Sequence, residues 1–241
     1  MPWSVQLLDI IHEDEELLVV NKLAGLVCHP TKGDALSSLI SRVRLHLGDS
    51  ARPHLINRLD RETSGVTLVA KNDEVARELR RRWENREVEK EYLAIVHGHV
   101  RGEQGVIDAP LGKDERSRVA IKDCVRPDGA ASQTEFQVER RFSRAEGDFS
   151  LLRVVPHTGR KHQIRIHLAH FGHPIVGDKL YGGDEDLYLA LVEDRLTVTQ
   201  RARLILPHHA LHAARVSFHR YEPLMSFSAR PEAWFEAFAA G

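Results

Sequence analysis

The 241-residue chain has few of the features that mark specialised protein classes. Its two cysteines, Cys28 and Cys124, are too few for a disulfide framework or a four-cysteine zinc site. Its apolar runs are only a few residues long, whereas a membrane helix needs about 20 apolar residues. The first residues are acidic, unlike those of a secretory signal. These absences predict a cytoplasmic protein with no membrane anchor.

The chain also has no marked excess of charge of one sign. It contains 34 Lys and Arg residues and 35 Asp and Glu residues, which gives a net charge of −1. A polyanion can therefore bind only where basic residues are locally concentrated. Residues 157–181 contain such a concentration, with four Lys or Arg residues, five histidines and only Asp178 in opposition. Residues 113–126 are a second basic stretch, which predicts either a loop that can grip a polyanion or a plain surface loop.

Strands outnumber helices in the pattern of the chain. Short apolar and β-branched runs predict strands at 5–11, 17–21, 54–60, 66–70, 92–97, 134–140, 151–155 and 211–218. Helical spacing predicts three helices capped by Asp34, Asn72 and Thr158, and a short apolar helix around Trp234. Strands and helices do not alternate strictly, and no flexible linker divides the chain. We therefore predict one domain over 1–241 of the mixed α+β class, with a largely antiparallel central sheet and flanking helices and loops.

The densest group of chemically active side chains lies at 57–65. It combines two carboxylates, two guanidiniums, two hydroxyls and a glycine between apolar strands. Flanking arginines keep Asp60 ionised, and an ionised carboxylate can act as a nucleophile or a base. A solvated turn with local ion pairs explains the same composition, so residue types alone leave both readings open.

Two further segments can take part in chemistry. In 158–165, a glycine, an arginine and a lysine precede an expected helix, an arrangement that suits a phosphate group. No metal is expected there, because His167 and His170 share a helix face without a Cys or carboxylate close in sequence. In 90–96, Tyr92 can stack on a base, transfer a proton, or simply pack in a half-buried strand.

In this order and spacing, these segments resemble the RluA/RluD-type family of RNA pseudouridine synthases. The resemblance runs from Asp14 to Phe218. It rests on the opening segment 13–30, on 58–65, on 90–92, and on 158–165 followed by 172–174 and 177–178. It implies the pseudouridine synthase catalytic fold and the isomerisation of uridine to pseudouridine in structured rRNA or tRNA, with no cofactor and no metal.

Carried over residue by residue, the resemblance makes Asp60 the catalytic aspartate. It makes Tyr92 the residue that stacks on the target base and Arg165 the partner of the catalytic carboxylate. It places Arg58 near the extruded nucleotide. The other matching residues shape the loop or contact RNA: Arg61, Thr63, Ser64, Gly65, Arg160, His162, Gln163 and Ile164.

The chain departs from the family pattern at two positions. Asn57 stands where histidine usually precedes Arg-Leu-Asp, and Leu23 stands where proline usually follows Asn-Lys. We expect both changes to tune loop contacts without abolishing activity. No N-terminal S4-like RNA-binding domain is expected, and a monomer is the default. Two other readings stay open: a catalytically silent RNA-binding or RNA-folding factor, and a glycosidase-like hydrolase that uses Asp60 and Glu62.

Overall fold

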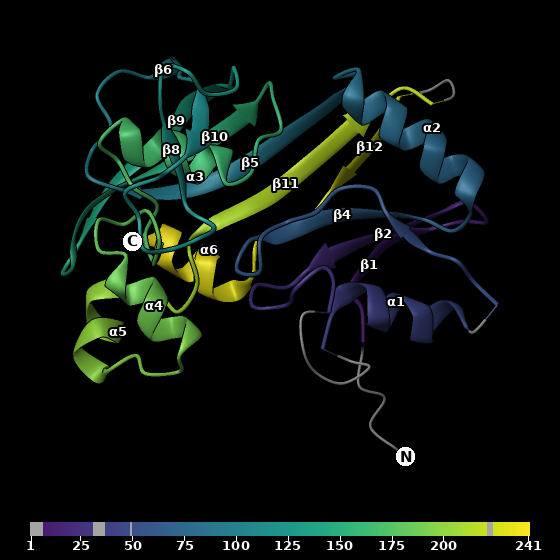
Figure 1. Cartoon of the computed structure of the whole chain (residues 1–241), viewed down its shortest axis with the longest axis horizontal. Helices are drawn as coiled ribbons and strands as arrows, with labels where there is room; N and C mark the ends of the chain where they lie inside the picture. The colour runs from purple at the N-terminus through teal and green to yellow at the C-terminus, as the bar shows by residue number, and fades with distance from the viewer. Residues whose placement is uncertain (1–6, 31–36, 49, 221–223) are drawn as a thin grey trace. The chain divides into compact units, whose positions relative to one another are not determined.

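A computed structural model describes residues 7–30, 37–48, 50–220 and 224–241 (Figure 1). The fold is mixed α+β with a large, mostly antiparallel sheet, which confirms the predicted class. The chain divides into two compact units: unit 1 comprises 1–90 and 213–232, and unit 2 comprises 91–212 and 233–241. The single catalytic domain expected over 1–241 stays a prediction. Among the described residues, no helix has the length and apolarity required to cross a membrane.

Unit 1 is built on antiparallel strands. β2 (Leu17–Lys22) lies between β1 (Ile10–Glu13) and β4 (Ser64–Ala70), and β4 also pairs with the short β3 (His54–Leu55). Most of β11 (Leu211–Phe218) belongs to this unit and pairs with β12 (Met225–Ser228). The strand expected at 5–11 begins only at Ile10, and the first two of its residues lie outside the described ranges.

The helices of unit 1 cover opposite faces of its strands (Figure 1). α1 (Leu39–Leu47) packs with Leu18 and Val20 of β2, whereas α2 (Asp73–Glu84) packs with Leu17 and Val19. Successive residues of a strand point to opposite faces, so the four apolar residues at the start of β2, 17–20, supply both cores. Each helix therefore has its own side of the sheet.

One expected helix cap in unit 1 is confirmed and the other is not. Asn72 caps α2, because its side-chain oxygen accepts a hydrogen bond from the Val75 amide at 3.0 Å. Ser38 caps α1 in the same way, through the Ser41 amide at 3.3 Å. Asp34, the expected cap of α1, lies outside the described residues.

Unit 2 contains four long or medium strands in the order β5, β10, β9, β6, all antiparallel. These are β5 (Val88–His97), β6 (Gln104–Asp108), β9 (Gln133–Arg144) and β10 (Gly147–Pro156). A two-stranded sheet of β7 (Leu111–Lys113) and β8 (Asp123–Val125) replaces the loop expected at 113–126. The helices are α3 (Gln163–His170), α4 (Asp186–Val192), α5 (Val198–Leu204) and α6 (Ala233–Ala240).

The core of unit 2 joins its strands to α3 and α6. Ile164 and Leu168 of α3 and Phe235 and Phe238 of α6 pack in one cluster with Phe149 of β10. The expected start of α3 at Thr158 is wrong, because the helix begins at Gln163 after a left-handed residue, His162, with φ of 56°. The segment before α3 is thus a fixed turn, which presents residues 158–162 outside the helix.

Candidate active site

Asp60 lies in unit 1, in the turn between β3 and β4. Its side chain is partly buried, and its backbone carbonyl accepts a hydrogen bond from the Thr63 amide at 3.2 Å. The turn enters β4 through Gly65, which has φ of 113°, and a Cβ there would overlap the Ala213 carbonyl of β11. Only glycine fits this close approach, so the expected loop-shaping role of Gly65 has a steric basis.

Lys22 ties the Asp60 turn to the end of β2. The side chain is only 1% exposed, and Nζ donates to the carbonyl oxygens of Leu23 at 2.9 Å, Leu26 at 2.8 Å and Arg61 at 3.2 Å. Burial lowers the pKa of the ammonium to about 8, and nearby acidic groups, Asp60 among them, oppose part of this shift. The three carbonyl oxygens therefore use all three ammonium donors.

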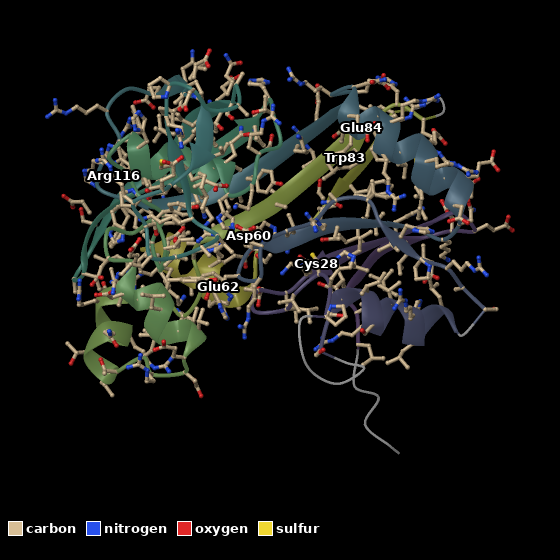
Figure 2. All side chains as sticks on the ribbon, in the orientation of Figure 1. Cys28, Asp60, Glu62, Trp83, Glu84 and Arg116 are labelled. Atoms are coloured by element: carbon tan, nitrogen blue, oxygen red, sulfur yellow. The ribbon has the colours of Figure 1, made fainter. Side chains whose placement is uncertain are left out.

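The carbonyl groups on both sides of Asp60 are fixed from the segment after β2. Figure 2 labels Asp60 in its turn and Cys28 in that segment. Cys28 donates its thiol to the Leu59 carbonyl oxygen, with Sγ and O 3.4 Å apart. Burial raises the pKa of this thiol, which keeps it protonated and able to donate. The Gly25 amide donates to the Arg61 carbonyl oxygen at 2.9 Å. The backbone that carries the carboxylate is therefore held before and after Asp60.

Asn57 performs a defined task where the family usually has histidine. Its Nδ2 donates to the Val66 carbonyl oxygen at 3.0 Å, and its Oδ1 accepts from the Leu68 amide at 2.8 Å. The side chain thus extends the pairing of the β3 segment with β4 toward the Asp60 turn. This agrees with the expectation that Asn57 adjusts loop contacts.

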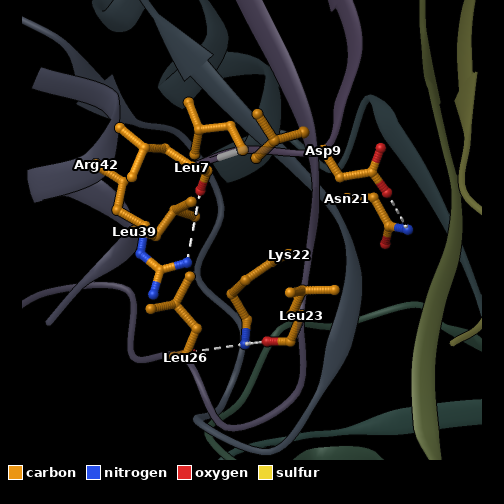
Figure 3. A pocket seen from close by; sticks show the side chains of 10 residues that line it. Leu7, Asp9, Asn21, Lys22, Leu23, Leu26, Leu39 and Arg42 are labelled. Atoms are coloured by element: carbon orange, nitrogen blue, oxygen red, sulfur yellow. Dashed lines mark hydrogen bonds between the residues drawn. The ribbon is translucent and has the colours of Figure 1, made fainter. Parts of the chain in front are cut away.

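A pocket of about 390 Å³ lies at the end of β2 in unit 1 (Figure 3). Five of its ten lining residues are leucines, and polar side chains of its wall hydrogen-bond within the chain. Asn21 donates to Asp9 at 3.0 Å, and Arg42 donates to the Leu7 carbonyl oxygen at 3.5 Å. Lys22 is one of the lining residues of this pocket, and Asp60 is not.

In unit 2, the expected Arg165 is held by a carboxylate to which the sequence assigned no role. Arg165 is 7% exposed and Asp178 is 2% exposed. The guanidinium contacts both carboxylate oxygens, with Nε–Oδ2 at 2.7 Å and Nη2–Oδ1 at 2.9 Å. Burial alone would raise the pKa of Asp178, but the Arg165 charge holds it well below its usual range. The motif residue Asp178 was visible in the sequence, but its partner was not.

Further contacts fix the same pair. The amides of Leu180 and Tyr181 donate to Asp178 Oδ1 at 2.9 and 3.0 Å. The Tyr181 ring lies under Arg165, with 5.0 Å between the guanidinium carbon and the ring centroid. The Tyr181 hydroxyl lies 2.9 Å from Nδ1 of His162. Arg165 and His162 are thus joined through one tyrosine.

The other expected residues of unit 2 divide into structural and exposed positions. The Gln163 side chain hydrogen-bonds to Thr158 at 2.7 Å and to Thr134 at 3.0 Å, and Ile164 packs in the core. Arg160 is exposed, with Nε 3.4 Å from the Ala131 carbonyl oxygen. RNA contact by these residues stays a prediction.

Tyr92 is partly buried in β5, opposite Val154 of β10, and packs against the core of unit 2. In unit 1, Thr63, Ser64 and Gly65 are buried, whereas Arg58 and Arg61 are exposed. The roles carried over to these residues therefore stay predictions.

The described residues bear on two interpretations of the sequence, a metal site at the histidines of α3 and RNA binding by the basic stretch 113–126. His167 is fully buried and uses both ring nitrogens, on Thr134 at 2.8 Å and the Ala109 carbonyl oxygen at 2.9 Å. In the described ranges, no group of three or more His, Cys, Asp or Glu side chains is placed to hold a metal ion. The basic 113–126 stretch is largely neutralised, for example by Lys122–Glu185 at 3.0 Å and Arg126–Glu115 at 2.9 Å.

The comparisons with known proteins show the family of the chain. A family model for RNA pseudouridylate synthase matches residues 16–170. The chain is 36% identical over 208 residues to an uncharacterized RNA pseudouridine synthase of Aquifex aeolicus, covering 84% of this chain and 64% of that protein. It is 36% identical over 220 residues to the dual-specificity RNA pseudouridine synthase RluA of Vibrio parahaemolyticus, covering 90% of this chain and 78% of that protein.

A solved structure shows the same similarity. Human RNA pseudouridylate synthase domain containing 1 superimposes with a TM-score of 0.75 at 26% identity, covering 98% of this chain and 89% of that one. Several curated relatives are longer: the chain spans 64% of the Aquifex protein and 58% of YlyB of Bacillus subtilis. The chain belongs to the RNA pseudouridylate synthase family, in its RluA/RluD-type branch.

Proposed function

We propose that this chain isomerises uridine to pseudouridine in structured RNA. The observation that supports this most directly is the Asp60 turn, in which a family-motif carboxylate sits on a backbone fixed on both sides by Cys28, Gly25 and Lys22. A rigid carboxylate is what the chemistry requires, because small displacements of a reacting group cost large factors in rate.

In the proposed reaction, the bond between ribose C1′ and uracil N1 breaks, and a bond between C1′ and C5 forms. The base turns between the two steps, C5 loses a proton and N1 gains one. Asp60 starts the reaction, either by attacking the sugar or by removing a sugar proton so that the base leaves as an anion. Tyr92 stacks on the detached base, and its hydroxyl can assist the later loss of the C5 proton. No external electron donor or group donor is needed.

Arg165 is proposed to pair with the Asp60 carboxylate during this reaction. A guanidinium has five N–H donors, of which the bidentate contact with Asp178 uses two. The contact with Asp178 therefore leaves Arg165 chemically able to serve a second carboxylate. The remaining expected contacts, from Arg58 and Arg61 to Arg160 and His162, are proposed to bind the RNA around the flipped nucleotide.

The substrate is proposed to be rRNA or tRNA. A relative from Zymomonas mobilis, 34% identical over 220 residues, is named ribosomal large subunit pseudouridine synthase D. The dual-specificity name of the Vibrio relative supports testing more than one RNA class. We further propose a monomeric enzyme that acts in the cytoplasm without a cofactor.

The first test is tritium release from RNA labelled at C5 of uridine, with rRNA and tRNA fractions assayed separately. Wild-type protein is expected to release tritium from one or both fractions, and Asp60→Asn is expected to lower the rate by about 10²–10⁴-fold or more. Asp128→Asn, which changes an exposed aspartate of unit 2, is the matched control and should retain the rate.

The alternatives give different results in the same assay. Free uracil as the product would indicate a glycosidase-like hydrolase. RNA binding without tritium release by wild-type protein, unaffected by Asp60→Asn, would indicate a catalytically silent RNA-binding or RNA-folding factor. Either result contradicts the proposed isomerase.

A further inference from the structure

Two arginines and a histidine of unit 1 flank the Asp60 turn, and none of the three has an acidic partner among the described residues. They are His29 after β2, Arg44 on α1, and Arg58, two residues before Asp60. All three side chains are exposed. Within the described ranges none of them forms an ion pair, although exposed cations usually gain a nearby carboxylate where one is available.

Backbone contacts at Cys28 bring the three segments together. The Ile40 amide of α1 donates to the Cys28 carbonyl oxygen at 3.1 Å. The Cys28 thiol donates to the Leu59 carbonyl oxygen at 3.4 Å. The end of the β2 loop, the start of α1 and the start of the Asp60 turn therefore meet at one buried residue.

The three side chains belong to residues next to this junction. His29 directly follows Cys28, Arg58 directly precedes Leu59, and Arg44 lies one helical turn beyond Ile40. Partial burial, and then the charges of Arg58 and Arg44, lower the pKa of His29, so the two arginines carry the positive charge here and both act on the His29 ring. An anion bound beside the two guanidiniums interacts favourably with both charges and raises the pKa of His29.

Some cations of unit 1 are neutralised by acids: Lys71 pairs with Glu13 at 2.7 Å, and Arg220 pairs with Glu16 at 2.6 Å. What distinguishes His29, Arg44 and Arg58 is their shared junction at Cys28, beside Asp60. A polyanion that approaches a carboxylate is repelled, so an RNA-modifying site needs positive charge on the same turn.

We propose that His29, Arg44 and Arg58 form a subsite for one backbone phosphate of the RNA. The subsite rests on the proposed function in that this phosphate flanks the target nucleotide. The two guanidiniums supply charge-assisted hydrogen bonds, and His29 donates to the same phosphate. The contact carries no base information and serves to hold the RNA in register over Asp60.

The first experiment measures the salt dependence of RNA binding. The protein carries Asp60→Asn, so that nothing turns over, and the RNA is the fraction that supports tritium release. Arg44→Gln is expected to weaken binding about three- to tenfold and to reduce the slope of log K against log salt by about one. Lys71→Gln removes one charge from the same unit at a site that is already paired, so it should leave the slope unchanged.

The second experiment follows His29 by NMR and needs no activity. Adding a short RNA without uridine, or inorganic phosphate in a separate sample, is expected to raise the His29 pKa, because an anion favours the charged ring. In the free protein, Arg44→Gln is also expected to raise it, because one repulsive charge is lost. An increase with RNA alone identifies a phosphodiester site, and an increase with both ligands identifies a general phosphate site.

The outcomes separate this inference from the proposed function. If tritium release is normal but neither the salt slope nor the His29 pKa responds, the subsite is wrong and the isomerase stands. If the His29 pKa responds but no RNA fraction releases tritium, the anion site stands and the isomerase is contradicted. Arg44 is exposed, so Arg44→Gln should fold, which thermal unfolding verifies.

Discussion

Lys22 in unit 1 and Arg165 in unit 2 are both buried cations of family motifs, but they are held in different ways. Lys22 has three backbone carbonyl oxygens as partners, whereas Arg165 has the buried carboxylate of Asp178. Neutral dipoles do not cancel a charge, and the pKa of Lys22 falls. A carboxylate does cancel it, and the pKa of Asp178 falls instead. The first arrangement ties loops together at a cost in charge burial, and the second forms a stable ion pair.

The largest expected effect comes from breaking the ion pair. Asp178→Asn leaves the buried Arg165 charge uncompensated, and loss of one partner of a buried pair costs about 3–5 kcal/mol. Chemical denaturation should show this loss of unfolding free energy, together with a strong loss of tritium release.

Asp128→Asn is the control for that prediction. It breaks a bidentate pair of similar geometry, with Arg126 Nε and Nη2 at 2.5 and 2.6 Å from the two oxygens, on the exposed surface. Little change is expected there, because solvent screens exposed pairs. Equal losses for the two variants would mean that burial does not distinguish the pairs.

Lys22→Met is expected to separate activity from stability. The variant leaves carbonyl oxygens without a donor, but it also removes a buried charge, so the net change in unfolding free energy should stay within about 2 kcal/mol. Loosening the Asp60 turn is expected to lower the rate by up to about 10²-fold. Lys71→Met, at a partly buried lysine paired with Glu13, is the control. Unchanged tritium release in Lys22→Met would contradict the positioning role.

The pH dependence of Lys22 should be opposite for stability and for activity. Its folded pKa, about 8, is below the ordinary 10.5, so the unfolded chain binds more protons between these values. Its contribution to stability therefore rises with pH across that window, by about 3 kcal/mol at most, is complete only above about pH 10.5, and is gone once pH has fallen to about 8. A neutral amine has only two N–H donors for three carbonyl oxygens, so the rate should fall above pH 8.

The pH dependence of stability and of rate is compared with that of Lys22→Met, which lacks the titrating group. Denaturation and tritium release are measured from pH 7 to pH 10 for both proteins. If the difference in unfolding free energy stays constant over this range, Lys22 does not titrate with the lowered pKa.

The smallest expected effect is at Cys28. Cys28→Val keeps the apolar volume but removes the thiol donor to the Leu59 carbonyl oxygen, at an expected cost of about 0.5–1.5 kcal/mol. The rate should fall less than in Lys22→Met, because Lys22 and Gly25 still hold the Arg61 side of the turn. A larger rate loss than in Lys22→Met would reverse the assigned order of the two contacts.

The sequence could predict features that depend on local pattern. The α+β class followed from the strand-rich pattern, and the cap at Asn72 followed from a local side-chain contact. The family followed from ordered motifs. The wrong cap at Thr158 shows the limit: its hydroxyl bonds to Gln163 and to the Gln133 amide, and the second residue lies on a distant strand.

The contacts that orient the site residues could not be predicted from the sequence for the same reason. Nothing in the sequence pairs Arg165 with Asp178 or brings the Lys22 ammonium to the Arg61 carbonyl oxygen, because both contacts depend on the folded chain. The contact of Cys28 is tertiary as well, because only the fold shows that its thiol reaches the Leu59 carbonyl oxygen. Residue types can be listed from a sequence, whereas the partner that orients each one is a tertiary property.

The division of unit 1 into two stretches of chain has a consequence for biosynthesis. Leu17 and Val19 share a core with Val216, Phe218 and Phe227, so this core cannot close until roughly 120 residues of unit 2 have been synthesised. At about 5–20 residues per second, that delay is on the order of ten seconds. During this interval the nascent half that carries Asp60 exposes apolar strand surface. Its yield in the cell is therefore sensitive to translation speed and to early protection by chaperones.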